Sequence, residues 1–258
     1  MLKLCVKFGY LKPKLFNERD NIAKAISPQN GKLVVLYVKS IEDAVLPYMT
    51  IQSKQTSDHV LKLRKVHILD PNEPLLEKIN NLWMRYEGID VPPLALIEVE
   101  YIKGFTFEKL WEICVKNEDL ARITKQIYQG LYVIHKAGYH CGDIDSGENI
   151  MIEGNEEQLS KVRAVVIDVE GGPITVNYQV INDLREVAFL IYEVISLGNA
   201  AFVRDDDSDD LVLQDNEDYA TLFRLEIDNY PEYENLMLVL LEIFDGRLDT
   251  AEEIVKRL

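Results

Sequence analysis

The sequence predicts an α+β fold in two parts, a β-rich part followed by a mainly helical part. Residues 32–65 contain three short apolar stretches rich in β-branched side chains and separated by polar turns, which is typical of a small antiparallel sheet. From residue 105 onward, apolar side chains recur at helical spacing, which is typical of helices packed on a core. With 258 residues, 47% of them hydrophobic, the chain can bury one large core or two smaller ones.

The β-rich part is expected to contain several strands and one helix. Asp70, Pro71 and Glu73 form a helix start, with a cap, a proline in the first turn and an acidic third position. Apolar side chains at helical spacing follow directly, and extended structure resumes over residues 89–104. The three strands expected before the helix are LVVLYVKS, AVLPYMTIQS and HVLKLRK.

The second part is expected to contain helices and one pair of strands. A continuous apolar stripe predicts a long helix over residues 120–136, which Ala137 and Gly138 close. Short apolar segments at residues 149–152 and 162–168 predict the two strands. Further helices are predicted at residues 105–117, 183–196, 233–244 and 250–258, the last of them capped by Asp249 or Thr250.

The charge of the chain argues against two classes of partner. Acidic residues outnumber basic ones by 44 to 28, and the net charge of −16 repels the phosphates of nucleic acids and anionic lipid headgroups. We therefore expect neither nucleic acid nor a membrane as a direct partner. The acidic stretch at residues 204–219 is expected to be a solvated loop, with a docking site for basic peptides as the alternative.

The cysteines and the N-terminus indicate the compartment. Cys5, Cys114 and Cys141 are odd in number and far apart, which predicts neither a disulfide framework nor a zinc cluster. Lysines interrupt the first residues, and no apolar run there is long enough for a signal peptide or a membrane span. These features favour a cytoplasmic location.

One stretch, GYHCGDIDSGENIMI at residues 138–152, gathers acidic and amide side chains beside a predicted strand. A helix precedes Asp143, a strand follows Asn149, and the next strand ends at Asp168. This order predicts that the oxygen-bearing side chains of Asp143, Asn149 and Asp168 lie close together at one edge of the strand pair. Phosphoryl transfer requires such an arrangement, because one carboxylate must face the nucleophile while an amide oxygen and a second carboxylate hold magnesium.

These residues resemble the motifs of the protein-kinase-like superfamily, especially its compact Bud32 and RIO branches. Atypical members carry H-G-D-x-x-x-x-N in the catalytic loop and D-F-G afterwards; this chain has HCGDIDSGEN and IDVEGG. The resemblance implies a bilobal fold, with a small antiparallel sheet and one helix in the N-lobe and a mainly helical C-lobe. It assigns residues 32–102 to the N-lobe and 103–258 to the C-lobe, with residues 1–31 as an extension packed on or preceding the N-lobe.

The resemblance also implies the residues that bind ATP and Mg²⁺. Asp143 would be the catalytic base, and Asn149 and Asp168 would be the magnesium ligands. The stretch HVLKL resembles the strand that carries the ATP-binding lysine, which makes Lys62 the candidate for the α- and β-phosphates. LIEVEYIKG resembles the hinge, with Val99 as gatekeeper. The hinge groups offered to adenine would be the backbone groups of Glu100 and Ile102, and Asp183 would anchor the catalytic loop from below.

The sequence departs from the family pattern in several places. Asn149 lies six residues after Asp143 instead of five, so Asp145 is a rival base. Val169 and Glu170 replace the aromatic residue of D-F-G, with Glu170 as a further metal contact or an exposed turn residue. The glycine-rich loop is missing from residues 40–43, which include two acidic residues that would repel a triphosphate. The family pattern also has a glutamate that pairs with the lysine. Either Glu73 or Glu77 is the candidate for pairing with Lys62.

Taken with the resemblance, the sequence predicts an atypical serine/threonine protein kinase that transfers the γ-phosphate of ATP to a protein hydroxyl. The acidic stretch would suit a basic protein substrate, and compact members of the family are often governed by a protein partner. A second alternative is a pseudokinase that serves as a scaffold, because the glycine-rich loop is missing. A third alternative is a small-molecule kinase of the same superfamily, but the short spacing between Lys103 and Asp143 leaves no room for the helical insert of such kinases.

Overall fold

The computed structural model describes residues 1–17, 22–70, 72, 74–75, 93–169, 171–197, 224 and 226–258. These residues form two compact units: Met1–Thr56 with Leu61–Ile102, and Ser57–Val60 with Lys103–Leu258. The helix predicted after Asp70, the acidic stretch at residues 204–219 and the candidates Glu73, Glu77 and Glu170 lie outside the described residues.

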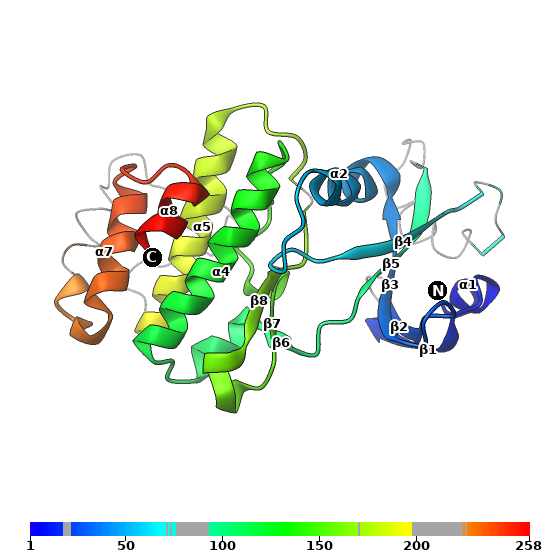
Figure 1. Ribbon diagram of the computed structural model, residues 1–258, viewed down its shortest axis with the longest axis horizontal. Helices are drawn as coiled ribbons and strands as arrows, with labels where there is room; N and C mark the ends of the chain where they lie inside the picture. The colour runs from blue at the N-terminus through cyan, green and yellow to red at the C-terminus, as the bar shows by residue number, and fades with distance from the viewer. Residues whose placement is uncertain are drawn as a thin grey trace, which may run out of the picture. The chain divides into compact units, whose positions relative to one another are not determined.

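A five-stranded antiparallel sheet forms the first unit (Figure 1). Its strands are β1 (Leu11–Asn17), β2 (Ile22–Ile26), β3 (Leu33–Ser40), β4 (Leu63–Ile68) and β5 (Leu94–Glu100), in the spatial order β1-β2-β3-β5-β4. The sequence analysis set residues 1–31 apart as an extension. In the structure, β1 and β2 are strands of the same sheet, and α1 (Leu2–Lys7) precedes them.

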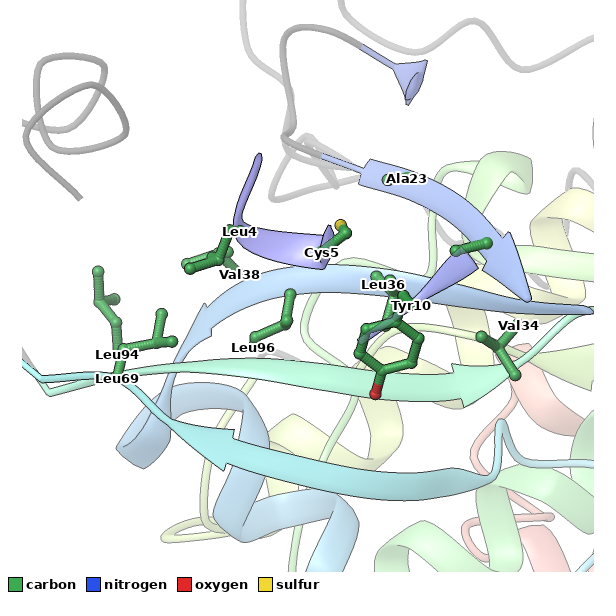
Figure 2. Packing of buried hydrophobic residues seen from close by; sticks show 11 residues of the cluster. Leu4, Cys5, Tyr10, Ala23, Val34, Leu36, Val38, Leu69, Leu94 and Leu96 are labelled. Carbon is green, nitrogen blue, oxygen red and sulfur yellow. The ribbon is translucent and has the colours of Figure 1, made fainter. Parts of the chain in front are cut away.

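Helix α1 covers one face of this sheet. Its buried side chains Leu4 and Cys5 pack with Leu36 of β3 and Leu96 of β5 in one hydrophobic cluster (Figure 2). Tyr10 follows the helix and donates a hydrogen bond of 2.8 Å to the buried carboxylate of Glu98. The pKa of Tyr10 is raised by burial, then by the hydrogen bond to Glu98 and the charge of that carboxylate. The phenol therefore remains a donor at neutral pH.

The stretch AVLPYMTIQS was predicted to be a strand, and this prediction is wrong. It forms a short π-helical turn (Ile41–Val45) that continues into helix α2 (Leu46–Lys54). Pro47 explains the difference, because proline is tolerated in the first turn of a helix but removes a donor from the ladder of a central strand. Tyr48 and Ile51 are three positions apart and are both buried, as expected for one face of a helix.

A three-stranded antiparallel sheet lies in the second unit. It consists of β6 (Gly104–Thr106), β7 (Ile150–Glu153) and β8 (Arg163–Val166), and the last two are the predicted strand pair. The helix predicted at residues 105–117 is instead β6 followed by a 3-10 turn at Phe107–Glu112. Gly104 is required there, since a Cβ atom would lie 1.8 Å from the carbonyl oxygen of Ile152 on β7.

Four helices of this unit lie entirely within the described residues (Figure 1). They are α4 (Asn117–Lys136), α5 (Asn177–Ser196), α7 (Glu234–Phe244) and α8 (Ala251–Arg257). Each confirms a predicted helix, although α5 begins six residues earlier than the predicted start at residue 183. Thr250 is the cap of α8, because its hydroxyl accepts a hydrogen bond from the N–H of Glu253. No helix in the described ranges has the length and apolar character needed to cross a bilayer.

Candidate functional site

The loop between α4 and β7 brings Asp143 and Asn149 together. The side-chain nitrogen Nδ2 of Asn149 donates to the backbone oxygen of Asp143 at 2.5 Å and to its carboxylate oxygen Oδ2 at 3.1 Å. Ser146 caps the 3-10 turn Gly147–Asn149 through its hydroxyl, which fixes the backbone at Asn149. The backbone oxygen of Asn149 also accepts from the N–H of Ile167, next to Asp168. Asn149 therefore links the loop at Asp143 to the backbone at Ile167, the residue before Asp168.

Asp183 holds this loop from α5, as the sequence predicted. Its carboxylate oxygen Oδ2 accepts from the N–H of Cys141 at 2.8 Å, and Oδ1 accepts from the N–H of Gly142 at 3.2 Å. His135 of α4 contacts Oδ2 at 2.7 Å through its Nε2 atom. Asp183 is fully buried, so these contacts compensate the desolvation of its charge. They fix the backbone immediately before Asp143.

Two glycines allow the segment after β8 to approach this loop. Gly142 has φ +81°, and a Cβ atom on it would lie 2.4 Å from the Cα atom of Gly171. A Cβ atom on Gly171 would in turn collide with the ring of His140. The N–H of Gly171 donates to the backbone oxygen of Cys141 at 2.6 Å. Gly171 is therefore needed for the close approach of the segment after Asp168 to the loop at Cys141 and Gly142.

Asn149 and Asp168 carry the side-chain oxygen atoms that the sequence analysis predicted as magnesium ligands. The described residues contain no cluster of three or more histidine, cysteine or acidic side chains spaced for a metal. Asn149 directs its nitrogen towards Asp143, so its side-chain oxygen is the atom that could act as a ligand. One amide oxygen and one carboxylate match magnesium, which keeps most of its ligands as water and phosphate oxygens.

Asn149 and Asp183 both bind the part of the loop that contains or directly precedes Asp143. Asn149 bonds to Asp143 in spite of the extra residue, and Asp183 holds the two amides immediately before Asp143. Ile144 is buried and separates the two aspartates along the chain. The insertion is thus absorbed between Asp143 and the 3-10 turn at Gly147–Asn149.

A buried glutamate, which the sequence analysis did not single out, lies one turn after Asp183 on α5. The Glu186 side chain accepts a hydrogen bond from Asn182 through Oε1, and its Oε2 atom is buried without a hydrogen-bond partner. Burial, followed by the charges of Asp183, Asp145 and Asp143, raises the pKa of Glu186 to about 8. The carboxyl group is therefore largely protonated at neutral pH. No local motif signals this residue, since its environment depends on how α5 packs.

We expect Glu186→Gln to change the pH dependence of stability. Between the ordinary pKa of 4.5 and about 8, folded Glu186 retains a proton that the unfolded chain has released. Stability of the natural protein therefore falls as pH rises through this window, and the isosteric amide removes this loss. Urea unfolding at pH 5 and pH 8.5 should show the variant gaining on the order of 2–4 kcal/mol relative to the natural chain. Parallel stability curves for the two proteins would contradict this assignment.

The residues predicted to bind nucleotide lie in the first unit. Lys62 stands one residue before β4, which is an edge strand, and its backbone oxygen accepts from the N–H of Glu100 at 3.0 Å. An adenine contact from Glu100 would therefore have to use its carbonyl group. Val99 and Ile102 are both buried, at the end of β5 and directly after it. Another lysine, Lys39, lies on β3 in the middle of the sheet.

Comparison with solved structures identifies the fold. Rad53 residues 1–466 in complex with AMP-PNP match with a TM-score of 0.60 and 13% identity, over 96% of this chain and 64% of that chain. A structure of the Rad53 kinase domain and SCD2 matches with a TM-score of 0.57 and 15% identity, over 92% of this chain and 85% of that one. No protein-family model and no curated protein matches the sequence.

The chain therefore has a protein-kinase-like fold, of α+β class, with an antiparallel five-stranded sheet. It spans slightly less than two thirds of the first Rad53 chain. At these levels of identity the likeness establishes the fold.

Proposed function

We propose that this protein is an atypical serine/threonine protein kinase that transfers the γ-phosphate of ATP to a protein hydroxyl. The observation that carries the proposal is the hydrogen bonding of Asn149 to Asp143 in a loop that Asp183 holds from below. In protein kinases, an aspartate and an asparagine of the catalytic loop act on the nucleophile and on magnesium. Burying a carboxylate costs desolvation free energy. That a buried carboxylate binds the backbone amides of this loop therefore favours a function that depends on the conformation of the loop.

Each residue of the site has a role in this proposal. Asp143 would accept the proton of the substrate hydroxyl, and the bond from Asn149 would orient its carboxylate. Asn149 and Asp168 would hold magnesium, which when bound neutralises charge on the phosphates. His140 braces the segment after Asp168, since its N–H donates to the backbone oxygen of Gly172 and its ring contacts Gln179.

Lys39 is a better candidate than Lys62 for the lysine that pairs with the α- and β-phosphates. Protein kinases carry this lysine on the third strand of the N-lobe, in the motif V-A-I-K. The third strand here is β3, in which Tyr37, Val38 and Lys39 end a similar motif. The sequence analysis counted HVLKLRK as the third strand, but β1 and β2 precede LVVLYVKS and AVLPYMTIQS is α2, so the third strand of the structure is β3.

A protein substrate and a regulatory protein partner follow from the same proposal. One of the similar structures contains the Rad53 kinase domain and SCD2. The strongly acidic composition of this chain favours a basic protein as the substrate.

A scaffold function is the second candidate, and the composition of α2 favours it. In protein kinases, a glutamate of the N-lobe helix forms an ion pair with the phosphate-binding lysine. The sequence of α2, LPYMTIQSK, contains no acidic residue. A pseudokinase would retain the fold and bind partners without transferring phosphate.

Nucleotide binding and phosphate transfer separate the two candidates. We expect millimolar Mg-ATP to raise the melting temperature of the natural protein, because a ligand that binds the native state stabilises it. Radiolabelled ATP should label a basic protein such as histone, and Asp168→Ala should abolish the labelling. Asp249→Ala, which removes an exposed aspartate before α8, is the folded control and should retain it. A protein that binds nucleotide but does not label the substrate would favour the scaffold, and so would a protein that does neither.

A further inference from the structure

A four-residue segment, Ser57–Val60, lies against the outer edge of the small sheet in the second unit. The chain on either side of this segment belongs to the first unit. In the strand order β6-β7-β8, β8 is an outer strand. Val60 forms a parallel bridge with Val166 of β8. The segment therefore flanks the strand that leads to Asp168.

His59 forms two hydrogen bonds with β8. Its backbone oxygen accepts from the N–H of Val166 at 3.0 Å, and its ring nitrogen Nδ1 lies 2.9 Å from the backbone oxygen of Ala164. A carbonyl oxygen can only accept, so Nδ1 carries the hydrogen. Ala164 and Val166 are fully buried, so water is a poor substitute for either bond. The residue is thus attached to β8 at two points, positions 164 and 166.

Two further side chains bring the segment to the edge of β8. The hydroxyl of Ser57 accepts from the N–H of His59 at 3.0 Å. Arg163, at the start of β8, donates through Nη1 to the backbone oxygen of Asp58 at 2.8 Å and through Nε to the carboxylate of Glu153 on β7 at 2.7 Å. The same guanidinium group therefore ties the segment to both strands.

Helix α4 leaves space for the carbonyl group of His59. A Cβ atom on Gly130 would lie 2.6 Å from the backbone oxygen of His59 and 3.1 Å from the Cγ2 atom of Val166. Rotation of a side chain cannot relieve the first contact, because it involves the backbone. Glycine within a helix lowers its stability, and Gly130 lies within the 20-residue helix α4. The close approach of the segment explains why a glycine stands there.

The two residues before Asp168 are both held by backbone hydrogen bonds. Val166 donates to the oxygen of His59, and Ile167 donates to the oxygen of Asn149 at 3.0 Å. The first bond comes from the segment and the second from the loop that contains the other candidate magnesium ligand. The conformation of the chain as it reaches Asp168 therefore depends on both partners.

We propose that His59 is a positioning residue for Asp168, because its two-point attachment to β8 orients the strand that presents this carboxylate to magnesium. The role of Asp168 as a magnesium ligand rests on the proposed function, whereas the attachment rests on the contacts of His59 alone. Groups that hold a metal ligand in place influence the affinity of the site, even though they do not touch the metal.

The test compares two substitutions of His59 with a control. His59→Ala removes the ring and with it the bond to Ala164. His59→Asn keeps a side-chain N–H donor close to the position of Nδ1 and should restore this bond. Thr250→Ala removes the cap of α8 and is the control for a general loss of stability in the same unit.

Two measurements report on the positioning without requiring activity. Amide hydrogen exchange at Val166 and Ile167 should accelerate about fivefold or more in His59→Ala and stay within about twofold in His59→Asn and Thr250→Ala. Mn²⁺, which prefers the same oxygen ligands as Mg²⁺, would be titrated in the presence of ADP and followed by electron paramagnetic resonance. We expect its Kd to rise about threefold or more in His59→Ala alone, less than the tenfold or greater loss typical of direct partners of a ligand.

The outcomes separate this inference from the proposed function, which a parallel assay of phosphate transfer tests. Faster exchange and weaker Mn²⁺ binding in His59→Ala, both restored in His59→Asn, support the inference. The same pattern in a natural protein that transfers no phosphate supports the positioning role and overturns the proposed kinase. An unchanged Kd for Mn²⁺ in His59→Ala, no recovery in His59→Asn, or an equal effect in Thr250→Ala overturns the inference. A natural protein that binds no Mn²⁺ overturns both.

Discussion

Asp143→Asn is expected to lower the rate of phosphate transfer by about two to four orders of magnitude, which is the usual contribution of a general base. The asparagine side chain retains an oxygen that can accept the hydrogen bond from Asn149 Nδ2, and the backbone oxygen at position 143 accepts the other bond as before. The loop should therefore keep its conformation, and the Kd for Mg-ATP should change by less than about threefold. Single-turnover transfer to a basic protein measures the rate, and calorimetry measures the affinity.

Asp145→Asn is the matched control for this experiment. Asp145 lies two residues further along the same loop, and the variant makes the same change of charge. If Asp143 is the base, Asp145→Asn should retain at least about a third of the natural rate. The opposite result, with the loss in Asp145→Asn and a nearly normal rate in Asp143→Asn, would make Asp145 the base. Equal and small effects in both variants would leave no base in this loop and would favour the scaffold.

The catalytic-loop region could be predicted from the sequence because its signals are local. The stripe of α4, the glycine before Asp143 and the short apolar strands β7 and β8 lie within about fifty residues. The contact between Asp183 and the loop is long-range, and it was predicted only through the resemblance of α5 to the central helix of kinases. The burial of Glu186 could not be predicted, since it depends on packing against the loop rather than on helical spacing.

The sheet of the first unit was predicted less well, for reasons that its strands make clear. In β2 the buried residues are Ala23 and Ala25, while Ile22, Lys24 and Ile26 are partly exposed on the other side. The larger apolar side chains of β2 therefore lie on its partly exposed face and the small alanines on its buried face. For this reason the strand shows no clear alternation of hydrophobic and polar residues in the sequence. Once β1, β2 and α2 are assigned from the structure, the third strand changes, and with it the candidate lysine.

Asp183→Asn is expected to destabilise the second unit by roughly 3–5 kcal/mol, as is typical when one partner of a buried charged network is altered. The natural carboxylate accepts from the N–H groups of Cys141 and Gly142 and contacts His135. An amide has one acceptor oxygen, so its NH₂ group would face a backbone donor and leave a buried N–H unpaired. Amide hydrogen exchange at Cys141 and Gly142 should accelerate, and transfer activity should fall together with stability.

Asp119→Asn provides the comparison within the same unit. Asp119 lies in the first turn of α4 and pairs with Arg122 at 3.7 Å, with 20% of its side chain exposed. Loss of such a partly exposed pair should cost about 1 kcal/mol or less. Because the second unit contains more than 150 residues, Asp183→Asn should lower the melting temperature by roughly 6–20 °C and Asp119→Asn by a few degrees. A melting temperature within about 2 °C of the Asp119→Asn value, with unchanged exchange at Gly142, would show that α5 does not hold the loop through Asp183.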